Sequence, residues 1–208
     1  LDASVRRVVM GLHPSEIADD GRFDDEPLEA RAGRIRPDAG QGLHVPHREI
    51  AAQRRHQRLP AGRRIGLVWS GSQMHANDAN RSLSLAKLLP LFQPGDVWVS
   101  LQKEVREADR AALEASGILD VSAELGDFAD TAALISALDL VISVDTSVAH
   151  LAGALGKPTW VMVPFAPDFR WLLDREDTPW YPRMRLFRQS RAGDWDGVIA
   201  RIGEALRA

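Results

Sequence analysis

The chain has 208 residues, of which 45% are hydrophobic and 26% charged, and its formal net charge is -3. These are ordinary values for a globular protein, and the charge gives no electrostatic case for binding nucleic acid or an anionic membrane surface. The absence of cysteine excludes disulfides, thiolate catalysis and cysteine-based zinc sites.

The apolar runs are short throughout the chain. None reaches the roughly 18 residues that a membrane-spanning helix needs, so no membrane span is predicted. The first sixteen residues, LDASVRRVVMGLHPSE, are too polar for a signal peptide, and a cytoplasmic location is the default expectation. The chain begins with Leu rather than Met, so we expect it to be a fragment.

Residues 1–62 differ in composition from the rest of the chain. All six Trp lie at or after Trp69, while this segment is rich in Arg, Asp, Gly and Pro. It has little apolar surface to offset its ordering entropy, so we predict an irregular or disordered segment. The alternative is an irregular but ordered subdomain. One short helix is expected at 47–59, ended by Pro60. The basic run at 54–64 is interpreted as a solvated linker, because no aromatic residue accompanies it for base stacking.

From residue 63 onward, short apolar runs typical of strands alternate with helical patterns. Strands are expected at 64–70, 97–102, 118–122, 140–145 and 158–163. Helices are expected at 84–92, 104–116, 127–138, 146–156 and 195–207. This alternation predicts βαβ units and a parallel sheet with helices on both faces. The predicted fold class is therefore α/β, a Rossmann-like domain over 63–208.

Ligands of such sheets bind beyond the carboxyl ends of the strands, so the residues directly after each strand are the informative ones. Asp145 ends a predicted strand, and Thr146 and Ser147 open the next helix, where free N–H groups favour an anion such as a phosphate. His150 lies one turn further along that helix. The alternative is structural: Asp145 or Thr146 caps the helix, and His150 is a half-buried histidine with its hydrogen bonds made.

The loop after the first strand, GSQMHANDANRS at 71–82, carries many hydrogen-bonding groups. Gly71 lets the backbone turn, and His75 and Asp78 offer polar atoms over the crevice. Arg81 is a permanent cation able to hold a phosphate with two hydrogen bonds. The alternative is a solvated loop with a surface ion pair. A metal site from these residues and the 145–150 turn is disfavoured, because the spacings match no standard metal motif.

Several of these motifs occur together and in a fixed order. They are GLVWSGSQMHANDANRSLSL, SLQ, DFADTAALISALDLVISVDTSVAHLAGALGKPTWVMVP, DFRWLLDREDTPWYPRMRLFRQ and GDW. Residues 63–206 thereby resemble the C-terminal half of a bacterial glycosyltransferase of GT-B architecture. The most similar group has tetratricopeptide repeats before a catalytic region related to heptosyltransferases and O-linked N-acetylglucosamine transferases.

The resemblance implies a single GT-B lobe that binds a nucleotide-diphospho-sugar donor and needs neither a cofactor nor a metal. It places the 71–82 loop, with Arg81, near the diphosphate. It places the turn from Asp145 to His150 on the donor's phosphates or sugar, and Gln102 in the nucleotide pocket. The leaving diphosphate would be stabilised by basic groups and a helix dipole.

The chain departs from that family in lacking the repeats and the acceptor lobe. We hypothesise that residues 1–62 are a frame-shifted remnant of that lobe, and we expect activity only with a separate acceptor lobe or chain. The alternatives are an inactive nucleotide-sugar-binding module or a remnant that binds nothing. A further alternative is an interaction domain that uses the Trp-rich stretch at 169–182. The expectation that counts against an interaction domain is that Trp171, Trp180 and Tyr181 pack on the sheet's own edge and are therefore not exposed.

Overall fold

The structure is a computed structural model that describes residues 59–208. The predicted irregular segment 1–62, with its helix at 47–59, falls almost wholly outside the described residues. The described elements, in chain order, are β1 (Arg63–Val68), α4 (Asp78–Arg81), α5 (Leu85–Leu88), η2 (Leu89–Leu91), β2 (Asp96–Ser100), α6 (Glu107–Ser116), β3 (Leu119–Asp120), η3 (Ser122–Glu124), α7 (Phe128–Ser136), β4 (Leu140–Val144), α8 (Ser147–Ala154), β5 (Thr159–Val163), η4 (Phe169–Trp171), β6 (Met184–Arg188) and α9 (Trp195–Arg207).

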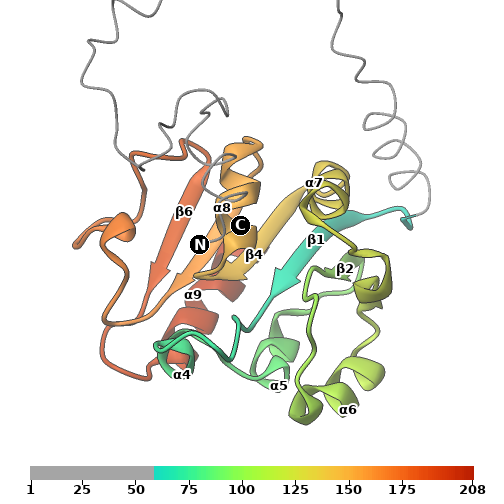
Figure 1. The fold of residues 1–208 in the computed structure, drawn as a ribbon, viewed down its shortest axis with the longest axis horizontal. Helices are drawn as coiled ribbons and strands as arrows, with labels where there is room; N and C mark the ends of the chain where they lie inside the picture. Colours follow the sequence, from blue (N-terminus) through green and yellow to red (C-terminus); the bar gives the residue numbers. More distant parts are fainter. Residues whose placement is uncertain (1–58) are drawn as a thin grey trace, which may run out of the picture. The chain divides into compact units, whose positions relative to one another are not determined.

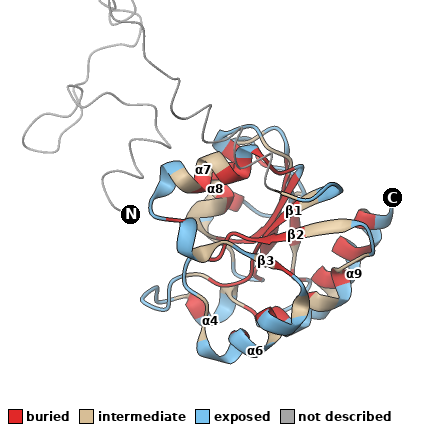
Figure 2. Ribbon diagram, turned by 90° about the vertical axis from the view of Figure 1, so that its right-hand side faces the viewer, coloured by how far each residue is buried: buried red, intermediate tan, exposed pale blue. Residues whose placement is uncertain are grey.

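The strands form one six-stranded sheet in the order β3-β2-β1-β4-β5-β6, and every neighbouring pair is parallel. Helices cover both faces: α7 and α8 pack on each other, while α5 packs against both α6 and α9 (Figures 1 and 2). The predicted Rossmann-like α/β fold is therefore confirmed. The chain leaves β1 toward β2 on one side and returns to β4 on the other, which makes the β1–β4 boundary the topological switch point.

The central strands form where the sequence has continuous apolar runs. All five residues of β4 are buried, as are the last four of β1, because helices cover both faces of a parallel sheet. The main core lies around these strands, and a second, smaller core joins α8, β5 and β6 around Trp171. None of the helices within 59–208 is long and apolar enough to cross a membrane.

Three predicted elements differ clearly from the structure, two of them for an identifiable local reason. The helix expected at 84–92 breaks into α5 and the 3-10 turn η2, because Pro90 cannot donate a helical hydrogen bond. The helix expected at 104–116 begins only at Glu107. The strand expected at 118–122 has two residues, because the Asp120 carboxylate accepts a hydrogen bond from the Ser122 N–H and turns the chain.

Candidate functional site

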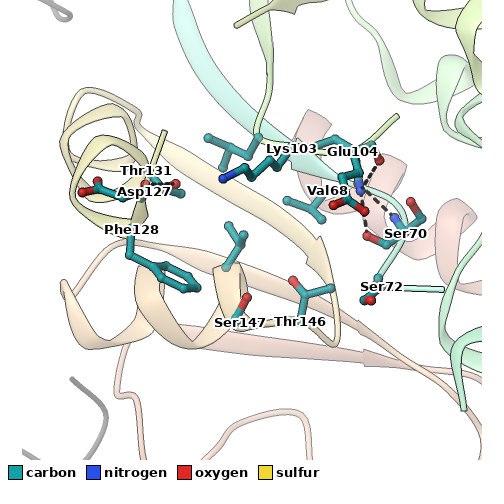
Figure 3. A pocket seen from close by; sticks show the side chains of 14 residues that line it. Val68, Ser70, Ser72, Lys103, Glu104, Asp127, Phe128, Thr131, Thr146 and Ser147 are labelled. Atoms are coloured by element: carbon teal, nitrogen blue, oxygen red, sulfur yellow. Dashed lines mark hydrogen bonds between the residues drawn. The ribbon is translucent and has the colours of Figure 1, made fainter. Parts of the chain in front are cut away.

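A cavity of about 260 Å³ opens at the carboxyl ends of β1, β2 and β4, at the topological switch point (Figure 3). Its walls come from four segments that are distant in sequence: the end of β1, the residues after β2, the first turn of α7 and the first turn of α8. The lining residues are Val68, Ser70, Gly71, Ser72, Leu101, Gln102, Lys103, Glu104, Asp127, Phe128, Thr131, Thr146, Ser147 and Val148. Of the predicted site residues, the structure brings Gly71, Gln102, Thr146 and Ser147 together here.

Gln102 lines the cavity, but its buried side-chain amide is already hydrogen-bonded to backbone groups. Its Oε1 accepts from the N–H groups of Trp69 and Ser70 at 3.3 and 3.2 Å. Its Nε2 donates to the carbonyls of Ser70 and Glu104 at 3.0 and 3.1 Å. Gln102 thus fastens the end of β1 to the segment after β2, and its contribution to a ligand site is to shape this wall.

The N-terminus of α8 forms the opposite wall and carries no side-chain cap. Thr146 occupies the N-cap position in an extended conformation, and its Oγ1 lies 3.2 Å from the Oγ of Ser143 rather than on the helix. By contrast, Asp127 caps α7 by accepting from the N–H groups of Ala129 and Asp130. The first N–H groups of α8 therefore remain available at the cavity, where the helix dipole favours an anion.

The wall formed by Lys103 and the start of α7 was not predicted from the sequence. In Figure 3 the Lys103 side chain extends toward α7, and its Nζ donates to the carbonyl of Gly126 at 2.8 Å. Phe128 is the first residue of α7 and is 42% exposed, an unusual place for a large aromatic side chain. The sequence signal that could have identified Phe128 is its position as a large apolar residue directly after the helix-capping Asp127. The cavity thus combines an ammonium group, an aromatic face and a free helix N-terminus.

The loop at 71–82 is held by an internal network instead of presenting its charges to the cavity. The buried carboxylate of Asp78 accepts from Arg106 Nη2 at 2.5 Å and from Ser82 Oγ at 2.7 Å. Arg81 donates from Nη1 to the carbonyl of Asp145 at 2.9 Å, and its side chain is only 12% exposed. A Cβ at Gly71 would lie 2.5 Å from Arg81 Nη2, so the glycine leaves room for the guanidinium.

Arg81 and Asp78 are therefore placed as parts of the loop's framework, beside the cavity but outside its lining. His75 is also outside the lining: its side chain is exposed, and its Nδ1 accepts from the Asn77 N–H at 3.1 Å. Among residues 59–208, no group of three His, Asp or Glu side chains is arranged to hold a metal ion.

His150 is not among the residues that line the cavity and contacts the second core instead. Its ring stacks on Trp171 with centroids 4.9 Å apart, and its Nδ1 lies 3.2 Å from the Tyr181 hydroxyl. Its Nε2 lies 3.9 Å from Oδ1 of Asp145. Burial lowers the pKa of His150, and the Asp145 carboxylate opposes that shift only in part. His150 is thus a mostly buried residue that links α8 to the connection between β5 and β6.

The Trp-rich stretch divides between buried and exposed positions. Trp171 is fully buried in the second core and Tyr181 packs against it. Trp180 is 60% exposed, and its Nε1 donates to the carbonyl of Arg170. The expectation that these aromatic residues pack on the sheet's own edge is therefore confirmed for Trp171 and Tyr181 and wrong for Trp180.

Comparisons with known proteins agree with this architecture. Residues 84–161 match the model of glycosyltransferase family 9 (heptosyltransferase). The predicted resemblance to heptosyltransferase-like glycosyltransferases is confirmed, and it relates the chain to glycosyl transfer in general. Protein FlbA of Caulobacter vibrioides is 33% identical over 160 residues, which span 73% of this chain and 26% of that relative.

Two solved structures share the fold at low sequence identity. A family 9 glycosyl transferase from Veillonella parvula has a TM-score of 0.53 at 12% identity, over 77% of this chain and 50% of that one. The ADP-heptose lipopolysaccharide heptosyltransferase II of E. coli has a TM-score of 0.51 at 17% identity, over 80% and 51%. The chain thus spans about a quarter of the curated relative and half of each solved structure.

Proposed function

We propose that residues 63–208 form the donor-binding lobe of a glycosyltransferase and that the cavity at the β1–β4 boundary binds a nucleoside-diphospho-sugar. The observation that carries the proposal is the meeting, in one cavity at the switch point, of an uncapped helix N-terminus, a lysine and an exposed aromatic ring. The family match supports glycosyl transfer as the reaction class.

The cavity offers a separate feature for each part of such a donor. The first turn of α8, with Thr146 and Ser147, binds the diphosphate through backbone N–H groups and hydroxyls. Phe128 provides a face on which the base stacks. Glu104, exposed at the mouth of the cavity, accepts from the ribose hydroxyls. Lys103 adds positive charge near the phosphates.

In the proposed reaction the acceptor's nucleophilic atom forms a bond to the anomeric carbon as the bond between that carbon and the diphosphate oxygen breaks, so negative charge develops on the leaving nucleoside diphosphate. The α8 N-terminus and Lys103 stabilise that charge, and a metal ion is not required for this step. Deprotonation of the acceptor needs a group in contact with the acceptor, which we assign to a separate lobe or chain. The relatives, whose chains extend well beyond the matched part, support this division.

Isothermal titration calorimetry with ADP, UDP, GDP and CDP tests the proposal. We expect saturable binding of one of them, and Phe128→Ala should weaken it about tenfold, because stacking on an aromatic face contributes about 1–3 kcal/mol. Phe169→Ala is the matched control, since Phe169 is 78% exposed and does not line the cavity. Absence of binding by all four nucleotides to the folded wild type would refute the proposal.

A retained binding module without turnover is the second candidate function, favoured because the cavity lies within this one chain. One experiment distinguishes this candidate from the donor-binding lobe of an active glycosyltransferase. Nucleotide binding without sugar release, in the presence of the rest of a related transferase, would identify the binding module.

A further inference from the structure

Tyr181 lies against α8 through a contact that only a glycine allows. A Cβ at Gly153 would lie 2.6 Å from Cγ of Tyr181, so the ring rests on the helix backbone at this position. Gly153 is three residues after His150 and therefore shares its helix face. This placement brings the Tyr181 hydroxyl to 3.2 Å from Nδ1 of His150.

The surroundings of the imidazole determine which ring nitrogen carries the proton. Burial raises the pKa of Tyr181, so its hydroxyl stays protonated and can donate. The other nitrogen, Nε2, faces the Asp145 carboxylate at 3.9 Å. A proton on Nε2 is attracted to that carboxylate, whereas a lone pair there would be repelled by it. The favoured arrangement is a hydrogen bond from Tyr181 to Nδ1, with the proton of the neutral ring on Nε2.

Asp145 is held from two sides at the point where β4 turns into α8. Its carbonyl accepts from Arg81 of the loop after β1, and its carboxylate faces His150. The next two residues, Thr146 and Ser147, line the cavity. This turn is therefore in contact with Arg81 directly and with Tyr181 through His150.

We propose that Tyr181 is a positioning residue of the nucleotide site: its hydroxyl fixes His150 as the Nε2–H tautomer directed at Asp145 and so holds the 145–147 turn against the cavity. This inference rests on the proposed function of the cavity. Tyr181 itself does not line the cavity, so its effect on a ligand passes through His150 and Asp145.

Long-range ¹H–¹⁵N NMR of the histidine rings, with the His150 signals assigned from a His150→Gln variant, reads the tautomer in the free protein. We expect a single Nε2–H pattern in the wild type and a mixture of tautomers in Tyr181→Phe, which keeps the ring but loses the hydroxyl. Gly153→Ala should have the same effect by displacing the ring. Trp180→Phe is the control, because Trp180 is adjacent in sequence and its indole Nε1 donates to the carbonyl of Arg170 and not to His150.

Nucleotide affinity is the second readout. Tyr181→Phe should weaken nucleoside diphosphate binding about threefold to tenfold, the equivalent of one hydrogen bond, with Trp180→Phe unchanged. An unchanged His150 tautomer in Tyr181→Phe would overturn the inference, and so would a changed tautomer with unchanged affinity. Absence of nucleotide binding by the wild type would instead refute the proposed function, and the positioning role would fall with it.

Discussion

The carboxylate of Asp78 gives the most specific prediction, because it is mostly buried and accepts hydrogen bonds from two identified side chains. The side chain is 12% exposed and accepts from Arg106 Nη2 at 2.5 Å and Ser82 Oγ at 2.7 Å. In Asp78→Asn, the new amide N–H₂ group must face one of these donors, and the loop loses the negative charge that balances Arg106 and Arg81. A hydrogen bond to a charged group contributes about 1.5–3 kcal/mol, so we expect unfolding to become easier by about 2–3 kcal/mol.

Urea denaturation at neutral pH measures this change. The slope of the free energy of unfolding against urea concentration should stay the same, which would show that only the stability has changed. Asp177→Asn is the matched control: its carboxylate pairs with Arg175 at 2.6 Å, but it is exposed. Exposed ion pairs contribute little, so its unfolding midpoint should not move. Equal effects of the two substitutions would show that the 71–82 loop is not held by its buried network, and the reasoning would fail.

Three further predictions concern the site and its surroundings. Gly71→Ala should destabilise the fold by about 1–3 kcal/mol in thermal unfolding, because the added methyl displaces Arg81; wild-type stability would contradict this close contact. Because the pKa of His150 is lowered in the folded state, the unfolded state binds the additional proton as the pH falls below about 6.5. Stability should therefore decline on acidification through that range, and His150→Gln should reduce the decline; an unchanged pH profile would contradict the assignment. Lys103→Ala should weaken nucleoside diphosphate binding more at low than at high salt, and a salt-independent loss would argue against a charge role.

Five of the six strands, β1 to β5, and the helices α5 to α9 could be predicted because they depend on local patterns. The strands that became β4 and β5 are continuous apolar runs, which a parallel sheet buries on both faces. The start of α7 follows from the capping pair Asp127 and Asp130. The positions of Thr146 and Ser147 at a ligand-sized cavity follow from the strand-end rule alone.

The remaining site features depend on tertiary packing, which single-sequence patterns do not encode. Arg81 was expected over the crevice as a phosphate ligand, yet it donates to the carbonyl of Asp145, 64 residues away. His150 was expected on the donor, yet Trp171 and Tyr181 surround it in the structure. Lys103 and Phe128 were missed because only the packing of α7 beside the end of β2 brings them to one cavity. That the predicted residues contact a ligand stays a prediction.

NMR chemical-shift mapping with the nucleoside diphosphate that binds most tightly tests the central claim most directly. We predict that amide shifts concentrate in the cavity walls, at 70–72, 101–104, 127–131 and 146–148, and leave α9 unaffected. The corresponding nucleoside without phosphates should perturb the α7 wall and spare the first turn of α8. Shifts confined to other surfaces, or none at saturating nucleotide, would contradict the assignment of this cavity to a nucleotide-sugar donor.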